Sequence, residues 1–426
     1  MNVTTDLFDL VAVALVAGLT PLVVAVIPGP RVPQVVVFLI GGVIIGPHVL
    51  GLANAVNVQL LADIGLGFLF LLAGYELDPR LLRQEPGRLA ITGWVISAAL
   101  AVAVAGALTA AGYIKDYVPV GLALTTTALG TLLPILRDNG MLGGEFGRHV
   151  YAAGAVGELF PILIIAVFLT KRGHFVALAS VALVGLLAIV LSVLPRLANS
   201  GLVRRLIREG QESTGQITLR WTVVLLFLLL AVASKFGLDV VLGAMLAGIV
   251  LRVWTGRLNI DVGSLERKFD AVGYGIFIPI FFVSSGMTID LKAIANDPLR
   301  LLLLLAMLLI VRGLPSMLVY RRVLPVRQRA EMTFITATSL PLLIALAAIG
   351  QQDGVMLPAT SAALVGAGVL SVLIYPLIAV GLHRGAPLTP VATGLVTDPA
   401  PEEPSPTGQD PAAGQVPRSV PDEWRQ

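Results

Sequence analysis

The sequence contains no cysteine and only four histidines, and 13% of its 426 residues are charged. The absence of cysteine excludes disulfides, thiolate metal sites and a cysteine nucleophile. The histidines lack metal-ligand spacing, and a soluble globular protein would carry about 25% charged residues. The net charge of +3 is spread along the chain and gives no basic face for nucleic acid. We therefore expect no cofactor, no enzymatic active site and no nucleic-acid partner.

Apolar residues make up 56% of the sequence, and they gather in thirteen segments that are long enough, or nearly so, to cross a bilayer. A membrane-spanning helix needs about 20 mostly apolar residues. The segments are 7–27, 31–50, 58–77, 89–111, 117–136, 149–170, 174–195, 218–234, 237–253, 273–289, 299–320, 329–349 and 357–381. The pattern predicts an all-α membrane protein with about thirteen transmembrane helices in a lipid bilayer. The eighth and ninth segments share the weak boundary SKFGLD, so twelve is the competing number.

Loop charge predicts the orientation of these helices. If the N-terminus lies outside, 20 arginine and lysine residues fall on cytoplasmic segments and six fall on outer loops. The positive-inside rule then places the protein in a cell membrane with its C-terminus in the cytoplasm. The start, MNVTTDLFDL, lacks the basic stretch of a signal peptide, which predicts a retained first helix.

The end of the sequence differs in composition from the transmembrane domain, which we assign to residues 1–383. Residues 384–426 are rich in proline and polar residues. Such a segment cannot bury an apolar core, so it is predicted to be a disordered cytoplasmic tail. We expect no nucleotide-binding domain after the transmembrane part.

Two stretches of the sequence resemble each other at a constant shift. LFLLAGYELD at 69–78 aligns with FFVSSGMTID at 281–290, a shift of 212 residues that also pairs Thr126 with Thr338. The shift predicts a first repeat at about 31–170, a linker helix at 174–195 and a second repeat at about 237–381. Because equivalent spans lie seven places apart in the order of helices, which is an odd number, the two repeats must be inverted in the membrane. Inverted repeats are typical of secondary transporters.

Two predicted helices carry hydroxyl clusters at equivalent positions of the repeats. Thr126 and Thr127 lie in LALTTTALGTLLP, and Thr338 and Ser339 lie in FITATSLPLLIA. The glycine or proline that follows each cluster weakens a helix, and the freed carbonyls inside a bilayer must be satisfied by protein, water or ions. The pattern predicts two discontinuous, crossing helices that offer oxygen ligands to a small cation. The alternative is that each hydroxyl bonds back to the preceding turn and only bends its helix.

Glu158 lies alone in the apolar run VGELFPILIIAV, about midway between Arg148 and Lys171. At about 1.5 Å per residue, this position is close to the membrane midplane. An ionised carboxylate there costs about 2.5–3.5 kcal/mol on insertion scales, and it can avoid that cost by binding a proton or a cation. Competition between the two predicts that Glu158 binds H⁺ and either Na⁺ or K⁺. The alternative is a protonated glutamate that only bonds a neighbouring helix.

Arg312 is a second charge predicted to lie inside the membrane, nine residues before Arg321. That spacing is about 13 Å along a helix, which is too far for comfortable snorkelling to the surface. Arg312 is predicted to balance charge, either by pairing with Glu158 or by facing the negative C-terminal ends of the interrupted helices. A purely structural arginine is the third possibility. Gly157 permits close helix approach or leaves room for water.

Other acidic residues near the predicted spans fall at helix ends, where the membrane interface can solvate them. We assign these as boundary or capping residues: Asp63, Glu76, Asp78, Asp239 and Asp290.

Five stretches over residues 10 to 382 resemble the monovalent cation:proton antiporter superfamily, and within it the bacterial Na⁺/H⁺ and Kef-type K⁺/H⁺ exchangers. These stretches are GGVIIGPHVLGL, LADIGLGFLFLLAGYELD, ALTTTALGTLLPILRDNGML, GLDVVLGAMLAGIVL and GYGIFIPIFFVSSGMTIDL. The resemblance implies thirteen helices in inverted repeats, a homodimer, and a core domain that moves against a scaffold. It also implies that Glu158 takes the place of the ion-binding aspartate, Arg312 that of the basic residue, and Thr126 and Thr127 those of the hydroxyl residues at the break.

One departure from this family bears on stoichiometry. Members usually carry Asn-Asp, Asp-Asp or Gln-Asp where this chain has Gly157-Glu158. With a single carboxylate, the resemblance implies electroneutral, one-for-one exchange of H⁺ for Na⁺ or K⁺ by alternating access. A cation-coupled symporter of an organic solute and a membrane sensor or scaffold without transport are the alternative functions.

Overall fold

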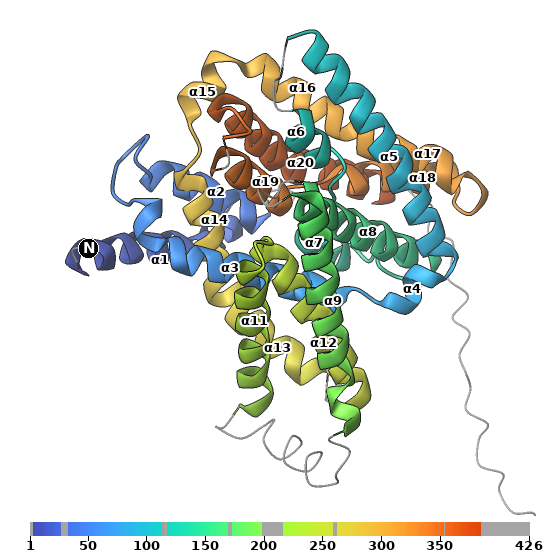
Figure 1. Cartoon of the computed structure of the whole chain (residues 1–426). Helices are drawn as coiled ribbons and strands as arrows, with labels where there is room; N and C mark the ends of the chain where they lie inside the picture. Colours follow the sequence, from blue (N-terminus) through green and yellow to red (C-terminus); the bar gives the residue numbers. More distant parts are fainter. Residues whose placement is uncertain are drawn as a thin grey trace, which may run out of the picture. The chain divides into compact units, whose positions relative to one another are not determined.

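The computed structural model describes residues 3–26, 33–112, 114, 117–168, 173–197, 216–258, 262–352 and 354–384. The chain divides into two units, Met1–Gly385 and Ala386–Gln426. The described residues belong to the first unit and are mostly helical (Figure 1). The predicted disordered tail lies, apart from Arg384, outside the described residues.

The helices before the linker helix form the first half of the unit. They are α1 (Val3–Val26), α2 (Gln34–Ile45), α3 (Ala55–Glu76), α4 (Pro79–Arg83), α5 (Glu85–Ala110), α6 (Tyr117–Ala123), α7 (Leu129–Asp138) and α8 (Gly144–Phe168). The linker helix is α9 (His174–Leu197), and α11 (Ile217–Lys235) follows it.

The second half begins with α12 (Val240–Leu258) and contains three long helices that change character along their length. One runs through α13 (Val262–Val272), the π-helical turn η1 (Gly273–Phe277) and α14 (Ile278–Met287). After the short α15 (Leu291–Asn296), the next runs through α16 (Pro298–Leu308), the π-helical turn η2 (Leu309–Gly313), α17 (Pro315–Val319) and the 3₁₀ turn η3 (Tyr320–Arg322). The last elements are α18 (Val326–Ala337), α19 (Pro341–Gln352) and α20 (Pro358–Arg384).

Each of the thirteen predicted segments contains helix. Within the described residues, ten helices are long and apolar enough to cross a membrane, and Gln34–Ile45 and Val240–Gly256 are shorter apolar helices. The remaining predicted segment, 117–136, is the broken pair α6 and α7, whose halves are each too short to span alone. The protein is therefore an all-helical, multi-pass membrane protein.

The boundary SKFGLD separates two helices, which favours thirteen segments over twelve. The N–H of Leu238 donates to the carbonyl of Ala233 at 2.9 Å, and that of Gly237 donates to Ser234 at 2.9 Å. With Gly237 at a φ of 72°, this is a Schellman motif, which satisfies the last carbonyls of α11. The Asp239 carboxylate then accepts from the N–H of Val241 at 2.8 Å at the start of α12.

The helix order of the second half repeats that of the first at the predicted shift. Adding 212 to the bounds of α7 gives 341–350, which lies within α19, and the same addition moves α4 onto α15. Both short helices begin with a capping aspartate: Asp78 accepts from Arg80 N at 2.8 Å and Asp290 from Lys292 N at 2.9 Å. This agreement supports the internal repeat, and it bears out the capping role expected of both aspartates.

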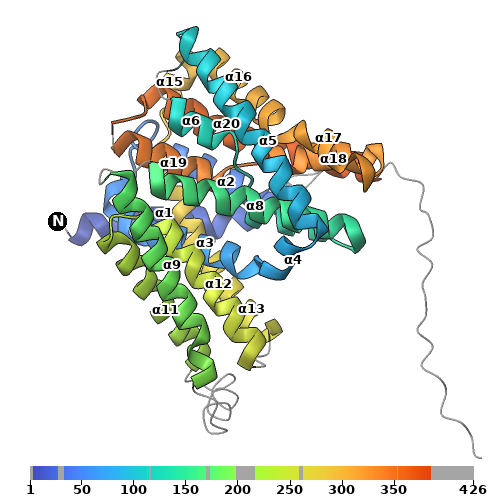
Figure 2. The same cartoon turned by 45° about the vertical axis from the view of Figure 1, so that its right-hand side comes forward.

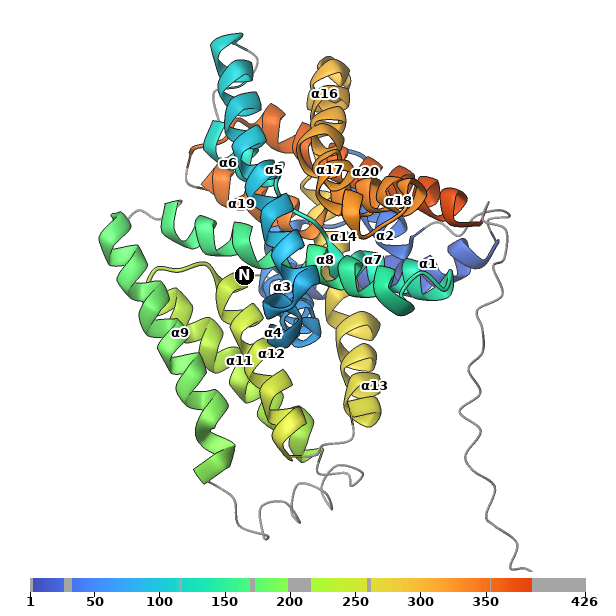
Figure 3. The same ribbon diagram turned by 90° about the vertical axis from the view of Figure 1, so that its right-hand side faces the viewer.

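Helix α7, the second half of one broken helix, lies in the middle of the helical unit. In Figures 1, 2 and 3, α9, α11 and α12 lie together at one side, α5 and α16 lie at the other, and α8 lies between them. Figures 1 and 3 show α7 between the same two groups. Helix α3 packs closely on α12. The approach at Gly74 leaves no room for a Cβ atom, which would meet the carbonyl oxygen of Met245. Small residues allow this backbone approach where packing drives helix association in a membrane.

Candidate functional site

The two breaks in the helices touch each other. Helix α6 ends at Ala123 and α7 begins at Leu129, whereas α18 ends at Ala337 and α19 begins at Pro341. The N–H of Ala128 donates to the carbonyl of Thr338 at 2.8 Å, and the hydroxyls of Thr126 and Ser339 are hydrogen-bonded. The prediction of two discontinuous, crossing helices is thereby confirmed.

The hydroxyls at the breaks have protein partners. Thr126 Oγ1 donates to the carbonyl of Ala123 at 2.7 Å, and Thr338 Oγ1 donates to that of Phe334 at 2.9 Å. These are bonds back to the preceding turn, the alternative that the sequence left open. The Thr338 hydroxyl satisfies a carbonyl near the end of α18 inside the membrane. The Thr126 hydroxyl adds a second bond to the Ala123 carbonyl, which also accepts from the N–H of Thr126 at 3.2 Å.

Glu158 reaches from the middle of α8 to the start of α7, and its side chain is 5% exposed. Its Oε1 atom accepts from the N–H of Leu129 at 2.7 Å and from that of Gly130 at 3.4 Å. The first N–H groups of a helix have no partner within the helix and carry its positive end, so they stabilise a carboxylate. The Oε2 atom is buried and has no hydrogen-bond partner. This carboxylate therefore has one fixed oxygen and one free oxygen.

Arg312 lies in the π-helical turn η2 and is 3% exposed. Its Nε donates to Thr127 Oγ1 at 2.9 Å and its Nη2 donates to the carbonyl of Ala153 at 3.0 Å. Thr127 Oγ1 in turn donates to the carbonyl of Thr336, in the last turn of α18, at 2.7 Å. Among the described residues we find no ion pair between Arg312 and Glu158. Of the roles predicted for Arg312, the geometry thus favours an interaction with an interrupted helix end over an ion pair with Glu158. Arg312 contacts Thr127 at the first break, and through it the C-terminal end of α18.

Gly157 leaves the space that the arginine fills. A Cβ on Gly157 would lie 2.6 Å from Arg312 Nη2 and 2.6 Å from both Cβ and Oγ1 of Thr127. The backbone also approaches closely here, since the N–H of Thr127 donates to the Gly157 carbonyl at 3.0 Å. No polar side chain fits beside Glu158 without moving the guanidinium, which gives a physical reason for the departure from the family pattern.

Replacing Gly157 by alanine is expected to lower the midpoint of thermal unfolding in detergent, followed by tryptophan fluorescence. Overpacking a tight interior costs about 1–3 kcal/mol. Gly106→Ala in α5 is the matched control, because a Cβ there meets nothing within 4 Å. Equal midpoints for the two variants would contradict the tight contact among Gly157, Thr127 and Arg312.

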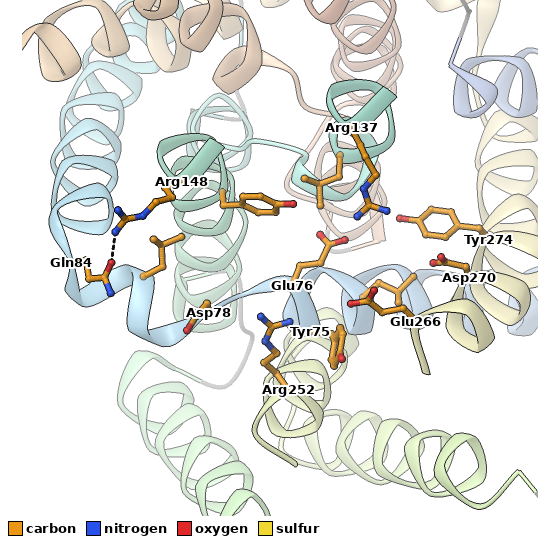
Figure 4. Close-up of a pocket in the computed structure, with 14 residues that line it drawn as sticks. Tyr75, Glu76, Asp78, Gln84, Arg137, Arg148, Arg252, Glu266, Asp270 and Tyr274 are labelled. Carbon is orange, nitrogen blue, oxygen red and sulfur yellow. Dashed lines mark hydrogen bonds between the residues drawn. The ribbon is translucent and has the colours of Figure 1, made fainter. Parts of the chain in front are cut away.

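A cavity of about 750 Å³ lies beside this site. Its charged and polar lining includes Arg137, Arg148, Arg252, Glu76, Asp78, Glu266, Asp270 and Tyr274 (Figure 4). The Tyr274 hydroxyl donates to the carbonyl of Gly130 at 3.4 Å, and the N–H of Gly130 faces Glu158. The cavity wall therefore contacts the turn that holds the carboxylate.

Sequence reasoning missed the cavity and two of its residues. Glu76 is the last residue of α3, as expected of a boundary residue, but its Oε2 atom is buried and has no hydrogen-bond partner. Tyr274 reaches the cavity from η1, and π-helical turns occur frequently at functional sites. Spacing in the sequence gave no sign that these residues of α3 and η1 meet the start of α7.

Two interrupted helices that cross beside a buried carboxylate define a class of membrane protein, the secondary transporters built on broken helices. The family model described as "Sodium/hydrogen exchanger, transmembrane" matches residues 11–382. The chain belongs to this family of transporters, and the resemblance to the cation:proton antiporter superfamily is confirmed.

Similar proteins carry related names. YjbQ of Bacillus subtilis (strain 168), a proposed Na⁺/H⁺ antiporter, is 26% identical over an alignment of 400 positions that covers 89% of this chain and 64% of YjbQ. The glutathione-regulated potassium-efflux system protein KefC of Enterobacter sp. (strain 638) is 26% identical over an alignment of 395 positions that covers 89% of this chain and 61% of KefC. The chain thus spans less than two thirds of the length of either relative.

A solved structure shares the fold. The sodium proton antiporter MjNhaP1 from Methanocaldococcus jannaschii at pH 8 superposes with a TM-score of 0.66 at 16% sequence identity. The match covers 89% of this chain and 96% of that chain. At this identity the likeness speaks for the fold alone.

Proposed function

We propose that this protein exchanges protons for Na⁺ or K⁺ across the cell membrane by alternating access. The observation that carries the proposal is the free Oε2 atom of Glu158 beside the crossing of two broken helices. The start of α7 keeps Oε1 in place, and Oε2 is the atom at which a proton or a monovalent cation binds. Since one negative charge attracts either ion, each displaces the other.

One cycle moves one ion each way. With a cation on Glu158 the broken helices carry it to the opposite face, where a proton displaces it, and the protonated carboxyl returns. A single carboxylate with a single free oxygen supports one-for-one, electroneutral exchange. Thr126 and Thr127, together with Thr338 and Ser339 of the other break, shape the site, and Arg312 balances the negative end of α18 through Thr127.

The choice between antiport and symport is supported by the relatives. YjbQ is named as a proposed Na⁺/H⁺ antiporter and KefC as a potassium-efflux system. Neither name describes a symporter. The names differ in the cation, so we propose a monovalent cation without choosing between Na⁺ and K⁺.

We further propose an orientation with the N-terminus outside and the C-terminus in the cytoplasm. The lining of the cavity supports this, since Arg137, Arg148 and Arg252 belong to the arginine-rich segments that the positive-inside rule assigns to the cytoplasm. The cavity then faces the cytoplasm. A homodimer, as the family resemblance implies, is the assembly we propose.

The test uses the full chain reconstituted in vesicles with an imposed pH gradient. Adding Na⁺, K⁺ or Li⁺ separately is expected to dissipate the gradient for at least one cation, at a rate that a clamped membrane potential does not change. A net charge would respond to the clamp, since 100 mV is worth about 2.3 kcal/mol per elementary charge. Because protons compete, the apparent KM for the cation is expected to rise as the pH falls, by up to about tenfold per unit. Absence of dissipation with all three cations would overturn the proposal.

A further inference from the structure

Glu76 is a second carboxylate near the membrane interior that the exchange through Glu158 does not use. Its Oε2 atom is buried without a hydrogen-bond partner, although the side chain lines the cavity. Figure 4 shows the Glu76 carboxylate pointing into the cavity, toward the Arg137 guanidinium and the Tyr274 hydroxyl. A buried unpartnered oxygen is costly, so a native structure has a reason to keep one.

The cavity connects Glu76 to the start of α7. Tyr274 lies beside Glu76 and donates to the Gly130 carbonyl, while the N–H of Gly130 donates to Glu158. An ion that leaves the cavity for the free oxygen of Glu158 therefore passes a negative charge that favours cations.

Glu76 differs from the other acids of the cavity. Glu266 and Asp270 are exposed, so water solvates their charges, whereas Glu76 is partly buried. Asp78 is also partly buried, but its carboxylate accepts from the N–H of Arg80 as a helix cap. The charge of Arg137 also acts on Glu76 and weakens its attraction for a cation. Conduction needs sites that attract an ion yet release it. A partly buried carboxylate with an arginine nearby provides such a site.

We propose that Glu76 is a loading site for the transported monovalent cation, which binds the Glu76 carboxylate at the cavity before it reaches Glu158. The Tyr274 hydroxyl oxygen, which lines the same cavity beside Glu76, is a second ligand for the cation. This inference rests on the proposed exchange and adds a binding step that belongs to one face of the membrane. A loading site on one face alters cation affinity at that face, whereas Glu158 serves both faces.

The experiment compares Na⁺ and K⁺ concentration dependence in everted and right-side-out membrane vesicles that contain the full chain. Glu76→Gln is expected to raise the apparent KM for the cation about five-fold at the cavity face and to leave it unchanged at the other face. The matched control is Glu266→Gln, which removes the same charge from an exposed position in the same cavity. It is expected to keep the KM of the unmodified protein at both faces.

An unchanged KM at the cavity face, an equal rise at both faces, or an equal rise in Glu266→Gln would overturn the loading site. Failure of the unmodified protein to exchange any cation would instead refute the proposed function. If Glu76→Gln does not fold, Arg137→Gln tests the loading site instead, because its expected effect on the KM is the opposite one. Removing the charge that competes at Glu76 is expected to lower the KM at the cavity face several-fold, and an unchanged or raised KM would contradict the proposal.

Discussion

Replacing Glu158 by glutamine is expected to abolish cation:proton exchange while leaving the protein folded. The amide oxygen of glutamine can accept from Leu129 N as Oε1 does at 2.7 Å, so the start of α7 keeps its partner. The amide group takes up no proton and carries no charge, so neither ion binds. The measurement is dissipation of an imposed pH gradient by Na⁺ or K⁺ in vesicles, with a decrease of at least about a hundredfold, because a cation near the midplane loses the carboxylate that binds it.

Two further variants make this result specific. Glu158→Asp keeps the charge but withdraws it by one methylene from the N–H groups of α7, so partial exchange with a raised cation KM is expected. Glu145→Gln removes a carboxylate from the exposed first turn of the same helix and is expected to exchange normally. Exchange by Glu158→Gln at the rate of the unmodified protein would exclude Glu158 from ion binding.

The two repeats differ at the start of their second half-helices, and this difference supports one ion site rather than two. In the first repeat, Leu129 and Gly130 offer N–H groups to Glu158. At the equivalent position of the second repeat, Pro341 has no N–H. Two residues before Pro341, the hydroxyl of Ser371 in α20 accepts from Ser339 N at 3.1 Å. A neutral hydroxyl thus serves the second break where a carboxylate serves the first.

The helices were predictable because their signals are local. Long apolar runs and loop charge predict membrane spans in any sequence of this kind. The eighth and ninth segments were the doubtful pair, and the turn at Gly237 separates them in the structure. The breaks were predictable because clusters of threonine or serine precede glycine or proline at the same shift in both repeats. Glu158 and Arg312 stood out because a charge inside an apolar run is costly.

Residues that depend on distant contacts were not predictable in the same way. Glu76 looked like a boundary residue because it falls at the end of an apolar segment. Only the fold brings the end of α3 close to η1 and α7, so the sequence gave no sign of the cavity. The partner of Arg312 was undecided in the sequence, since Thr127 lies 185 positions away along the chain. The packing at Gly157 depends on the same contact. The sequence shows only that Gly157 has no side chain, whereas in the structure Arg312 and Thr127 occupy the space beside it.

Replacing Arg312 by methionine is expected to reduce exchange at least tenfold with little loss of folded protein. Methionine fills much of the same volume, and replacing a buried charge by an apolar side chain is often neutral for stability. What is lost is the bridge from η2 to Thr127 and to the Ala153 carbonyl, so the break and α8 are no longer fixed relative to each other. The measurement is vesicle exchange together with the thermal midpoint in detergent.

Lysine at position 312 separates charge from geometry. Its ammonium keeps the positive charge, but a single nitrogen cannot reproduce the two directions in which Nε and Nη2 donate. We therefore expect Arg312→Lys to exchange faster than Arg312→Met and more slowly than the unmodified protein. Arg300→Met is the control, because it removes an arginine from the N-terminal end of the same long helix, where Arg300 pairs with Asp297 at 3.0 Å. Exchange by Arg312→Met at the unmodified rate would mean that the arginine neither positions the break nor balances its charge, because both effects end with the guanidinium.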